Sequence, residues 1–134
     1  MKTTILFTTL GLSLLLIGVS CKKNEATPAP VSAEGKWVGN YHSGFGGPVN
    51  YFALNFKAAG ILDVEANSAG SPDVASGTWN LASDSIRGSF TYLAGTMSTY
   101  SFAAKYSSNS TIMNGTLGIG VNSAGAGIFS VTKQ

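Results

Sequence analysis

Residues 74–92 have the sequence VASGTWNLASDSIRGSFTY, in which small or apolar side chains alternate with hydroxyl and amide side chains. Ala75, Gly77, Trp79 and Leu81 form one alternating row, and the same pattern returns after the polar residues 83 and 84. A period of two is that of a β-strand with one face buried. The stretch therefore predicts two antiparallel strands, 74–81 and 85–92, joined by a short turn.

Six further segments alternate in the same way, each bounded by Gly, Pro, Asn, Asp or Ser. After Glu34, no segment repeats apolar residues at helical spacing over three turns. The predicted strands are residues 36–42, 50–57, 61–66, 74–81, 85–92, 98–107, 111–118 and 126–133. The sequence therefore predicts one all-β domain over residues 34–134.

Eight strands with short connections predict an antiparallel up-and-down meander. An open meander has two exposed edges, and closure into a small eight-stranded barrel removes both. We therefore expect a barrel, with a two-sheet β-sandwich as the alternative because it produces nearly the same pattern. Five glycines fall on the predicted inner face, where they leave room for aromatic rings: Gly39, Gly77, Gly88, Gly115 and Gly127.

One face of the predicted strands carries most of the large apolar side chains. The expected inner residues are Trp37, Tyr41, Phe52, Leu54, Phe56, Leu62, Val64, Trp79, Leu81, Ile86, Phe90, Tyr92, Tyr100, Phe102, Tyr106, Met113, Leu117, Phe129 and Val131. Burying one such side chain contributes roughly 1.5–3 kcal/mol, so this set can fold about 100 residues without a disulfide. Trp79 is expected to lie in the core at mid-strand, far from either end of the barrel.

The N-terminal residues 1–20 have the features of a secretory signal peptide. Lys2 precedes an apolar run over residues 5–19, which is short for a membrane span of roughly 20 residues. The run ends in Gly18-Val19-Ser20-Cys21, which resembles the lipoprotein box of bacterial lipoproteins. That resemblance implies that acyl chains on Cys21 anchor the mature chain to a membrane.

Residues 21–33 then form a lipidated cysteine and a flexible linker, stiffened by Pro28 and Pro30. We expect a lipid-anchored protein of the cell envelope, in the outer membrane. The sequence does not distinguish the periplasmic face of that membrane from its surface face.

Charge is balanced in the predicted barrel. The chain has a formal net charge of +2, but from Glu34 onward five basic residues face five acidic ones. A neutral domain without a basic stripe argues against nucleic acid as a partner. One cysteine and one histidine exclude a disulfide framework and most metal sites, so we expect neither metal nor cofactor.

Two copies of a G-x-W motif, Gly35-Lys36-Trp37 and Gly77-Thr78-Trp79, carry a family resemblance. Together with residues 87–92, 114–118 and 127–133, they resemble small lipocalin-like lipoproteins of Bacteroidetes-type bacteria, within the calycin group of lipocalins and avidins. The resemblance covers residues 34–134 and implies a barrel with an internal ligand site. The chain is shorter than true lipocalins, lacks their C-terminal helix, and lacks the polar biotin contacts of avidins, so no ligand is carried over.

The sequence does not predict an enzyme, and no catalytic residue is expected. His42, the one histidine, is expected to be an exposed residue at a loop edge. Asp63 and Glu65 lie on the predicted outer face, and the glycine-rich loop 44–48 lacks the Lys-Ser/Thr pair of a phosphate-binding loop.

Four tyrosines are the candidate ligand-binding residues: Tyr41, Tyr92, Tyr100 and Tyr106, expected near one mouth. Phe45, at the tip of the glycine-rich loop, is a fifth candidate, as a lid or partner contact, or as a plug. We expect the barrel to bind a small, mostly apolar ligand in a pocket below roughly 300 Å³ at the end nearest Phe45. The alternative is a structural or protein-interaction lipoprotein with a filled barrel, whose protein partner the sequence does not identify.

Overall fold

The computed structural model describes residues 31–44, 46–71, 75–95 and 97–134. The strands are β1 (Gly35–Ser43), β2 (Val49–Phe56), β3 (Ile61–Ala66), β4 (Ala75–Ala82), β5 (Ser85–Tyr92), β6 (Thr99–Lys105), β7 (Ile112–Ile119) and β8 (Gly127–Lys133). A short 3₁₀ turn, η1 (Ala58–Gly60), joins β2 to β3. The all-β prediction is confirmed, and the predicted strand boundaries differ from the observed ones by no more than two residues.

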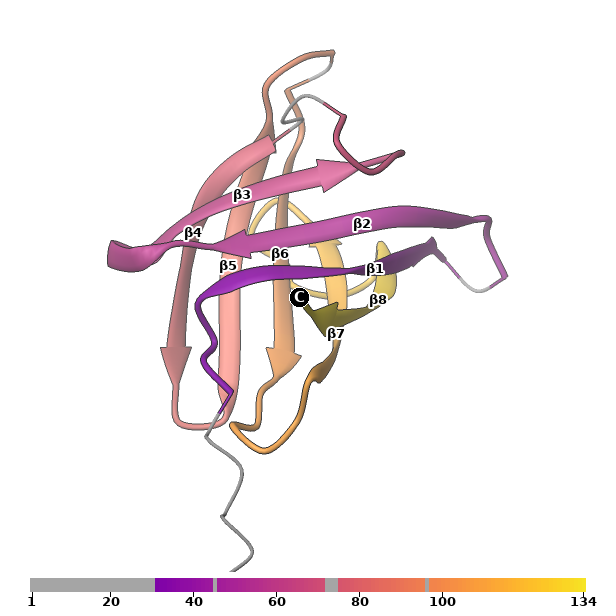
Figure 1. Cartoon of the computed structure of the whole chain (residues 1–134). Coiled ribbons are helices and arrows are strands. Elements are labelled where there is room, and N and C mark those ends of the chain that lie inside the picture. Colours follow the sequence, from indigo (N-terminus) through magenta and orange to yellow (C-terminus); the bar gives the residue numbers. More distant parts are fainter. Residues whose placement is uncertain (1–30, 45, 72–74, 96) are drawn as a thin grey trace, which may run out of the picture.

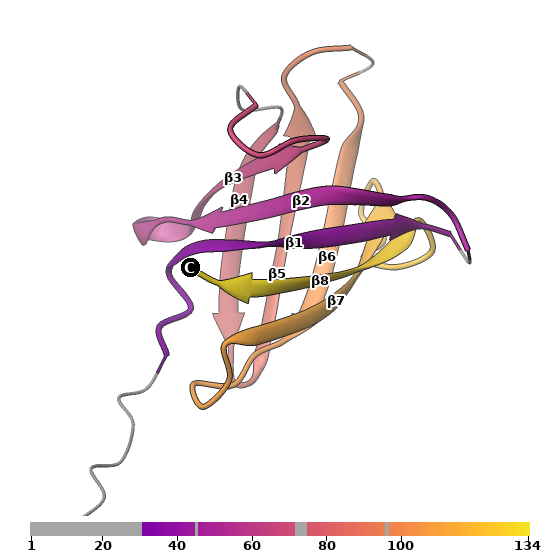
Figure 2. The same ribbon diagram turned by 45° about the vertical axis from the view of Figure 1, so that its right-hand side comes forward.

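The sheet closes on itself. Each strand pairs antiparallel with the next, and β8 pairs with β1, from Trp37 opposite Lys133 to Ser43 opposite Gly127. Figure 2 shows β8 lying between β1 and β7. The predicted barrel is therefore confirmed, and the sandwich alternative is wrong because the last strand completes a ring with the first.

The two ends of the barrel differ in which connections they carry. Residues 31–34 lie at the end that holds the β2–β3, β4–β5 and β6–β7 connections, which we call the entry end (Figure 1). The other four connections lie at what we call the far end (Figure 1). The chain segment before β1 therefore joins the barrel at the entry end, opposite the four far-end connections.

The interior is packed solid from the entry end through the middle. Its largest fully buried side chains are Trp37, Phe52, Phe56, Phe90, Phe102, Leu54, Leu62, Ile86, Met113, Val64 and Val131. A Cβ on Gly88 would lie 2.5 Å from Cε1 of Phe102, and one on Gly115 would lie 2.6 Å from Cε1 of Phe129. The aromatic rings occupy the space beside these two glycines, so the glycines leave no opening in the middle of the barrel.

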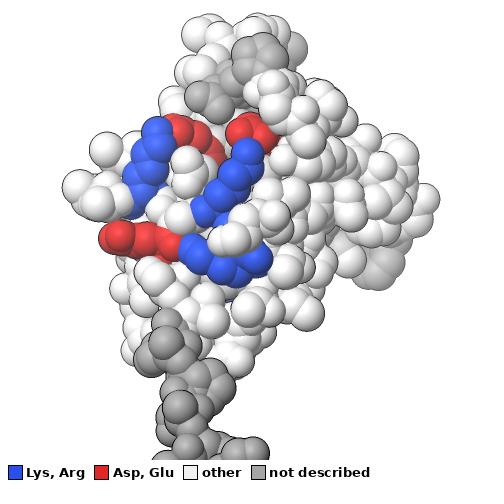
Figure 3. Space-filling model, in the orientation of Figure 1, with Lys and Arg blue, Asp and Glu red and all other residues white. Residues whose placement is uncertain are grey.

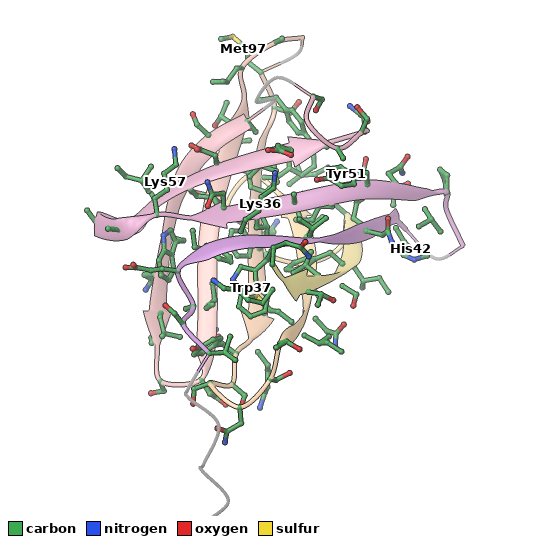
Figure 4. The ribbon with its side chains drawn as sticks, viewed as in Figure 1. Lys36, Trp37, His42, Tyr51, Lys57 and Met97 are labelled. Atoms are coloured by element: carbon green, nitrogen blue, oxygen red, sulfur yellow. The ribbon has the colours of Figure 1, made fainter. Side chains whose placement is uncertain are left out.

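Trp37 closes the entry end. Its ring is fully buried, and its Nε1 donates a hydrogen bond to the carbonyl of Ala33 at 2.9 Å. The Lys133 ammonium lies 5.4 Å from the ring centroid and also donates to the Glu34 carbonyl. In Figure 4, Trp37 lies along β1 near the point where the chain enters. The segment before β1 is thus attached to the barrel through the indole.

Trp79 and Leu81 depart from the prediction. Trp79 packs on Phe56, with ring centroids 5.0 Å apart, but it is partly exposed, and its Nε1 donates to the Lys57 carbonyl at 2.9 Å. Leu81 is 42% exposed. Pairing of β3 with β4 starts at Ile61 opposite Thr78, so the last residues of β4 extend past the start of β3 at the entry end. Trp79 packs against the core, as predicted from the alternation, but at an end of the barrel rather than in its middle, whereas Leu81 does not pack against the core.

Charged residues gather on the outer face of β1, β2 and β3, where Lys and Asp or Glu are intermixed (Figure 3). Lys36 contacts Glu65 at 2.8 Å, and Lys57 pairs with Asp63. The hydrogen bond from Lys36 lowers the pKa of Glu65. Asp63 and Glu65 are therefore each paired with a lysine on the outer surface, so they do not form a pair of free carboxylates.

Candidate functional site

A cavity of about 270 Å³ opens at the far end of the barrel. The residues that line it come from β1, β2, β5, β6, β7 and the approach to β8. They are Tyr41, Ser43, Phe52, Phe90, Tyr92, Tyr100, Leu117, Ile119 and Ala126. This volume is below the roughly 300 Å³ expected of the pocket.

The floor and walls of this cavity are aromatic. Phe52 and Phe90 are buried and form its floor, whereas Tyr41, Tyr92 and Tyr100 are partly exposed and form its walls. All five face inward because they share the inner parity of their strands. The floor residues belong to the packed core, so the cavity does not extend beyond them toward the entry end.

The rings meet at defined angles. Phe90 and Tyr100 stack, with centroids 5.8 Å apart and an angle of 17° between their planes. Tyr92 meets Tyr100 edge to face at 5.6 Å and 85°, and Tyr41 meets Phe52 at 5.6 Å and 66°. These are favoured aromatic arrangements, which help to hold the wall side chains in place.

The three wall tyrosines have phenol groups without partners among the residues that the structure describes. Within the described part of the chain, the hydroxyls of Tyr41, Tyr92 and Tyr100 make no hydrogen bond to another residue. By contrast, the Tyr51 hydroxyl donates to Glu65 at 3.3 Å, and the Tyr106 hydroxyl donates to the Val31 carbonyl. Within the described residues, the wall hydroxyls therefore keep their hydrogen-bonding capacity unused.

The cavity is a poor place for negative charge. Burial raises the pKa of Tyr92 to about 12, and the neighbouring Tyr41 and Tyr100 phenols add to the shift. None of the described residues that line the cavity carries a charge. The Tyr92 hydroxyl is therefore neutral, and able to donate a hydrogen bond, throughout the physiological pH range.

Tyr92 is expected to make the folded protein lose stability in strong alkali. Its folded pKa of about 12 lies above the value of about 10 in an unfolded chain. The resulting stability is complete below pH 10 and is lost as the pH rises toward the folded pKa. Tyr92→Phe should remove the late-titrating phenolate from the ultraviolet absorbance curve and flatten the alkaline loss of stability. Tyr106→Phe is the control, and identical titration curves for wild type and Tyr92→Phe would contradict the prediction.

The structure brings three of the four predicted tyrosines together and separates the fourth. Tyr106 lies directly after β6 at the entry end, bonded to Val31, so its placement at the same mouth is wrong. Tyr100 lies on β6, and Tyr106 follows six residues later in the same extended segment. At a rise of roughly 3.3 Å per residue, the two lie about 20 Å apart along the strand.

The remaining candidates lie outside the described residues. Ser43 ends β1 and lines the cavity, so the β1–β2 connection that holds Phe45 starts at the cavity edge. Phe45 itself and Cys21 are not among the residues that the structure describes.

Some lining residues were not predicted as part of a site. Phe52, Phe90 and Leu117 were expected only as core, and Ser43, Ile119 and Ala126 were not singled out. The signal that identifies Ile119 is register, since it lies opposite Tyr100 on the neighbouring strand. Alternation within one strand does not contain that information.

The described residues offer little else for chemistry. They contain no group of three or more His, Cys, Asp or Glu side chains that is able to hold a metal ion. His42 lies near the end of β1, away from Lys57 and η1 (Figure 4), and it is partly exposed. None of the described helical segments is long and apolar enough to cross a membrane.

Comparison of the chain with protein-family models, with curated proteins and with solved structures finds no match. The lipocalin-like resemblance and the lipid anchor therefore rest on the sequence alone.

Proposed function

We propose that this protein is a cell-envelope lipoprotein whose barrel binds one small, mostly apolar ligand in the far-end cavity. The observation that carries the proposal is an aromatic cavity of about 270 Å³ with three phenol groups that have no partner among the described residues. An apolar pocket with a few converging polar groups is the usual form of a small-molecule site.

The binding energy in this proposal comes from the aromatic floor and walls, and the phenols orient the ligand. Burying apolar ligand surface contributes roughly 25 cal/mol per Å² before the costs of association. The alternative, a structural or protein-interaction lipoprotein, is favoured by the solid packing of the entry half. The two functions differ in whether any small molecule stabilises the fold.

A screen of small hydrophobic compounds for a rise in melting temperature tests the proposal. Ala126→Leu adds bulk at the cavity, so it should weaken binding of any hit at least tenfold. Ala82→Leu makes the same chemical change on the exposed end of β4, at the entry end, and should leave binding unchanged. If no compound raises the melting temperature of the wild-type protein, the interaction role is the one that remains.

The anchor is tested separately. In the proposal, acyl chains on Cys21 hold the protein in the outer membrane, and ten residues of chain reach from there to Val31 at the entry end. At about 3.5 Å per residue, this places the barrel within roughly 35 Å of the anchor, with the cavity on the opposite end.

Cys21→Ser is expected to abolish membrane retention or to leave the signal peptide uncleaved, because the acylated thiol is lost. Ser20→Ala, which keeps a small residue before the cysteine, is the matched control. Fractionation and immunoblotting give the readout. Full membrane retention of Cys21→Ser with normal processing would show that Cys21 is not the anchor.

A further inference from the structure

We infer that the ligand is a planar aromatic molecule of one or two rings that carries a neutral hydrogen-bond acceptor, and that the cavity selects against carboxylates and aliphatic molecules. This inference rests on the proposed function and specifies the chemical class of its ligand. Three independent features of the cavity support it: the depth, the ring geometry and the absence of charge.

The depth limits the ligand to a small molecule. The floor residues Phe52 and Phe90 are 1% and 2% exposed, and beneath them Phe102 and Phe129 continue the packed core. Phe52 lies 5.6 Å from Phe129, and Phe90 lies 6.5 Å from Phe102, measured between ring centroids. An extended acyl chain therefore has no channel below the floor, and a compact molecule fits the volume of about 270 Å³.

The ring geometry favours a flat aromatic group. The stacked Phe90 and Tyr100 rings present nearly parallel faces, and Tyr92 stands edge-on to both of them, at 76° to Phe90 and 85° to Tyr100. A planar ring placed among them can make both stacked and edge-to-face contacts. A saturated ring of the same size has no π face, so it gains only apolar burial.

The charge and hydrogen-bonding pattern favours a neutral acceptor. The phenols of Tyr41, Tyr92 and Tyr100 offer O–H donors without protein acceptors among the described residues. A carbonyl or ether oxygen on the ligand would accept one of these bonds. A carboxylate would lose its hydration without meeting a cation, because the lining residues that the structure describes include no Lys, Arg or His.

Four probes of similar size separate these features: acetophenone, ethylbenzene, cyclohexyl methyl ketone and benzoate. Each is titrated at neutral pH into the mature-length chain, residues 21–134 with Cys21→Ser, and affinity is measured by amide chemical-shift changes. Acetophenone should bind tightest. Ethylbenzene and cyclohexyl methyl ketone should bind at least threefold more weakly, and benzoate at least tenfold more weakly.

Variants assign the hydrogen bond. Tyr92→Phe should weaken the binding of acetophenone several-fold and leave the binding of ethylbenzene unchanged, because only the ketone accepts a hydrogen bond from the phenol. Tyr51→Phe, which removes a phenol on the outer face, is the matched control and should affect neither probe. Shift changes should centre on the strand ends that line the cavity.

The outcomes separate this inference from the function on which it rests. Benzoate or cyclohexyl methyl ketone binding as tightly as acetophenone would overturn the ligand class and leave ligand binding intact. The same holds if all four probes fail while another compound in the screen raises the melting temperature. Failure of every probe and every screened compound would overturn the proposed function itself.

Discussion

Replacing Trp37 with alanine is expected to lower the free energy of unfolding by about 3–5 kcal/mol, the usual cost of removing a buried tryptophan. The indole is 0% exposed and lies at the closed entry end of the barrel. Its loss leaves a cavity, leaves the Ala33 carbonyl without its Nε1 donor, and removes the ring beneath Lys133. The segment before β1 would lose its attachment at the same time.

Trp79→Ala is the matched comparison, because both tryptophans belong to a G-x-W motif. Trp79 is partly exposed, so its replacement should cost clearly less than that of Trp37. Chemical denaturation of the two variants measures the difference. A loss below about 1 kcal/mol for Trp37→Ala would contradict the assignment of this residue as the main closure of the entry end.

Gly88→Val is expected to destabilise the barrel by about 3 kcal/mol, at the upper end of the usual cost of overpacking. The first added carbon alone would lie 2.5 Å from Cε1 of Phe102 and 2.5 Å from the Thr78 carbonyl oxygen. The phenyl ring can move only by disturbing its contacts with Phe56 and Phe129. The Thr78 carbonyl belongs to the backbone of the neighbouring strand β4 and moves only if the strand does.

The double variant Gly88→Val with Phe102→Leu tests this explanation. Removing the ring should recover part of the lost stability, so the two changes should be non-additive. Ser76→Ala, at an exposed position of β4, is the control and should stay within about 0.5 kcal/mol of wild type. Additive losses at Gly88 and Phe102 would show that the glycine does not make room for that ring.

The sequence predicts which face of each strand is buried, but not the height of a residue along the barrel. Alternation correctly placed Phe52, Phe90 and Phe102 inside, because side-chain parity is a local property of a strand. It placed Trp79 at mid-barrel and Tyr106 at the wrong mouth, because height depends on register between strands. Register is set by pairs such as Ile61 with Thr78, which lie on different strands, and alternation within one strand carries no information about such pairs.

The candidate site was predictable in part for the same reason. Tyr41, Tyr92 and Tyr100 were identified from their inward parity and their polar tips, and the cavity joins all three. Ile119 and Ala126 were not identified, since their role depends on how β7 and β8 lie beside β6 and β1. Closure of the barrel, which excluded the sandwich, depends on the same long-range pairing of β8 with β1.

The pairing of β8 with β1 also has a consequence for how the chain folds. It joins opposite ends of the barrel sequence, from Trp37 with Lys133 to Ser43 with Gly127, so its loop-closure entropy is paid over almost the whole domain. Such non-local topologies fold in roughly milliseconds to seconds, more slowly than helical bundles. Until β8 has been synthesised, β1 can pair only with β2, and its other edge stays unpaired. The unfinished sheet therefore keeps an aggregation-prone edge open until its final strand pairs with the first, and closure of this ring is the step that ends that risk.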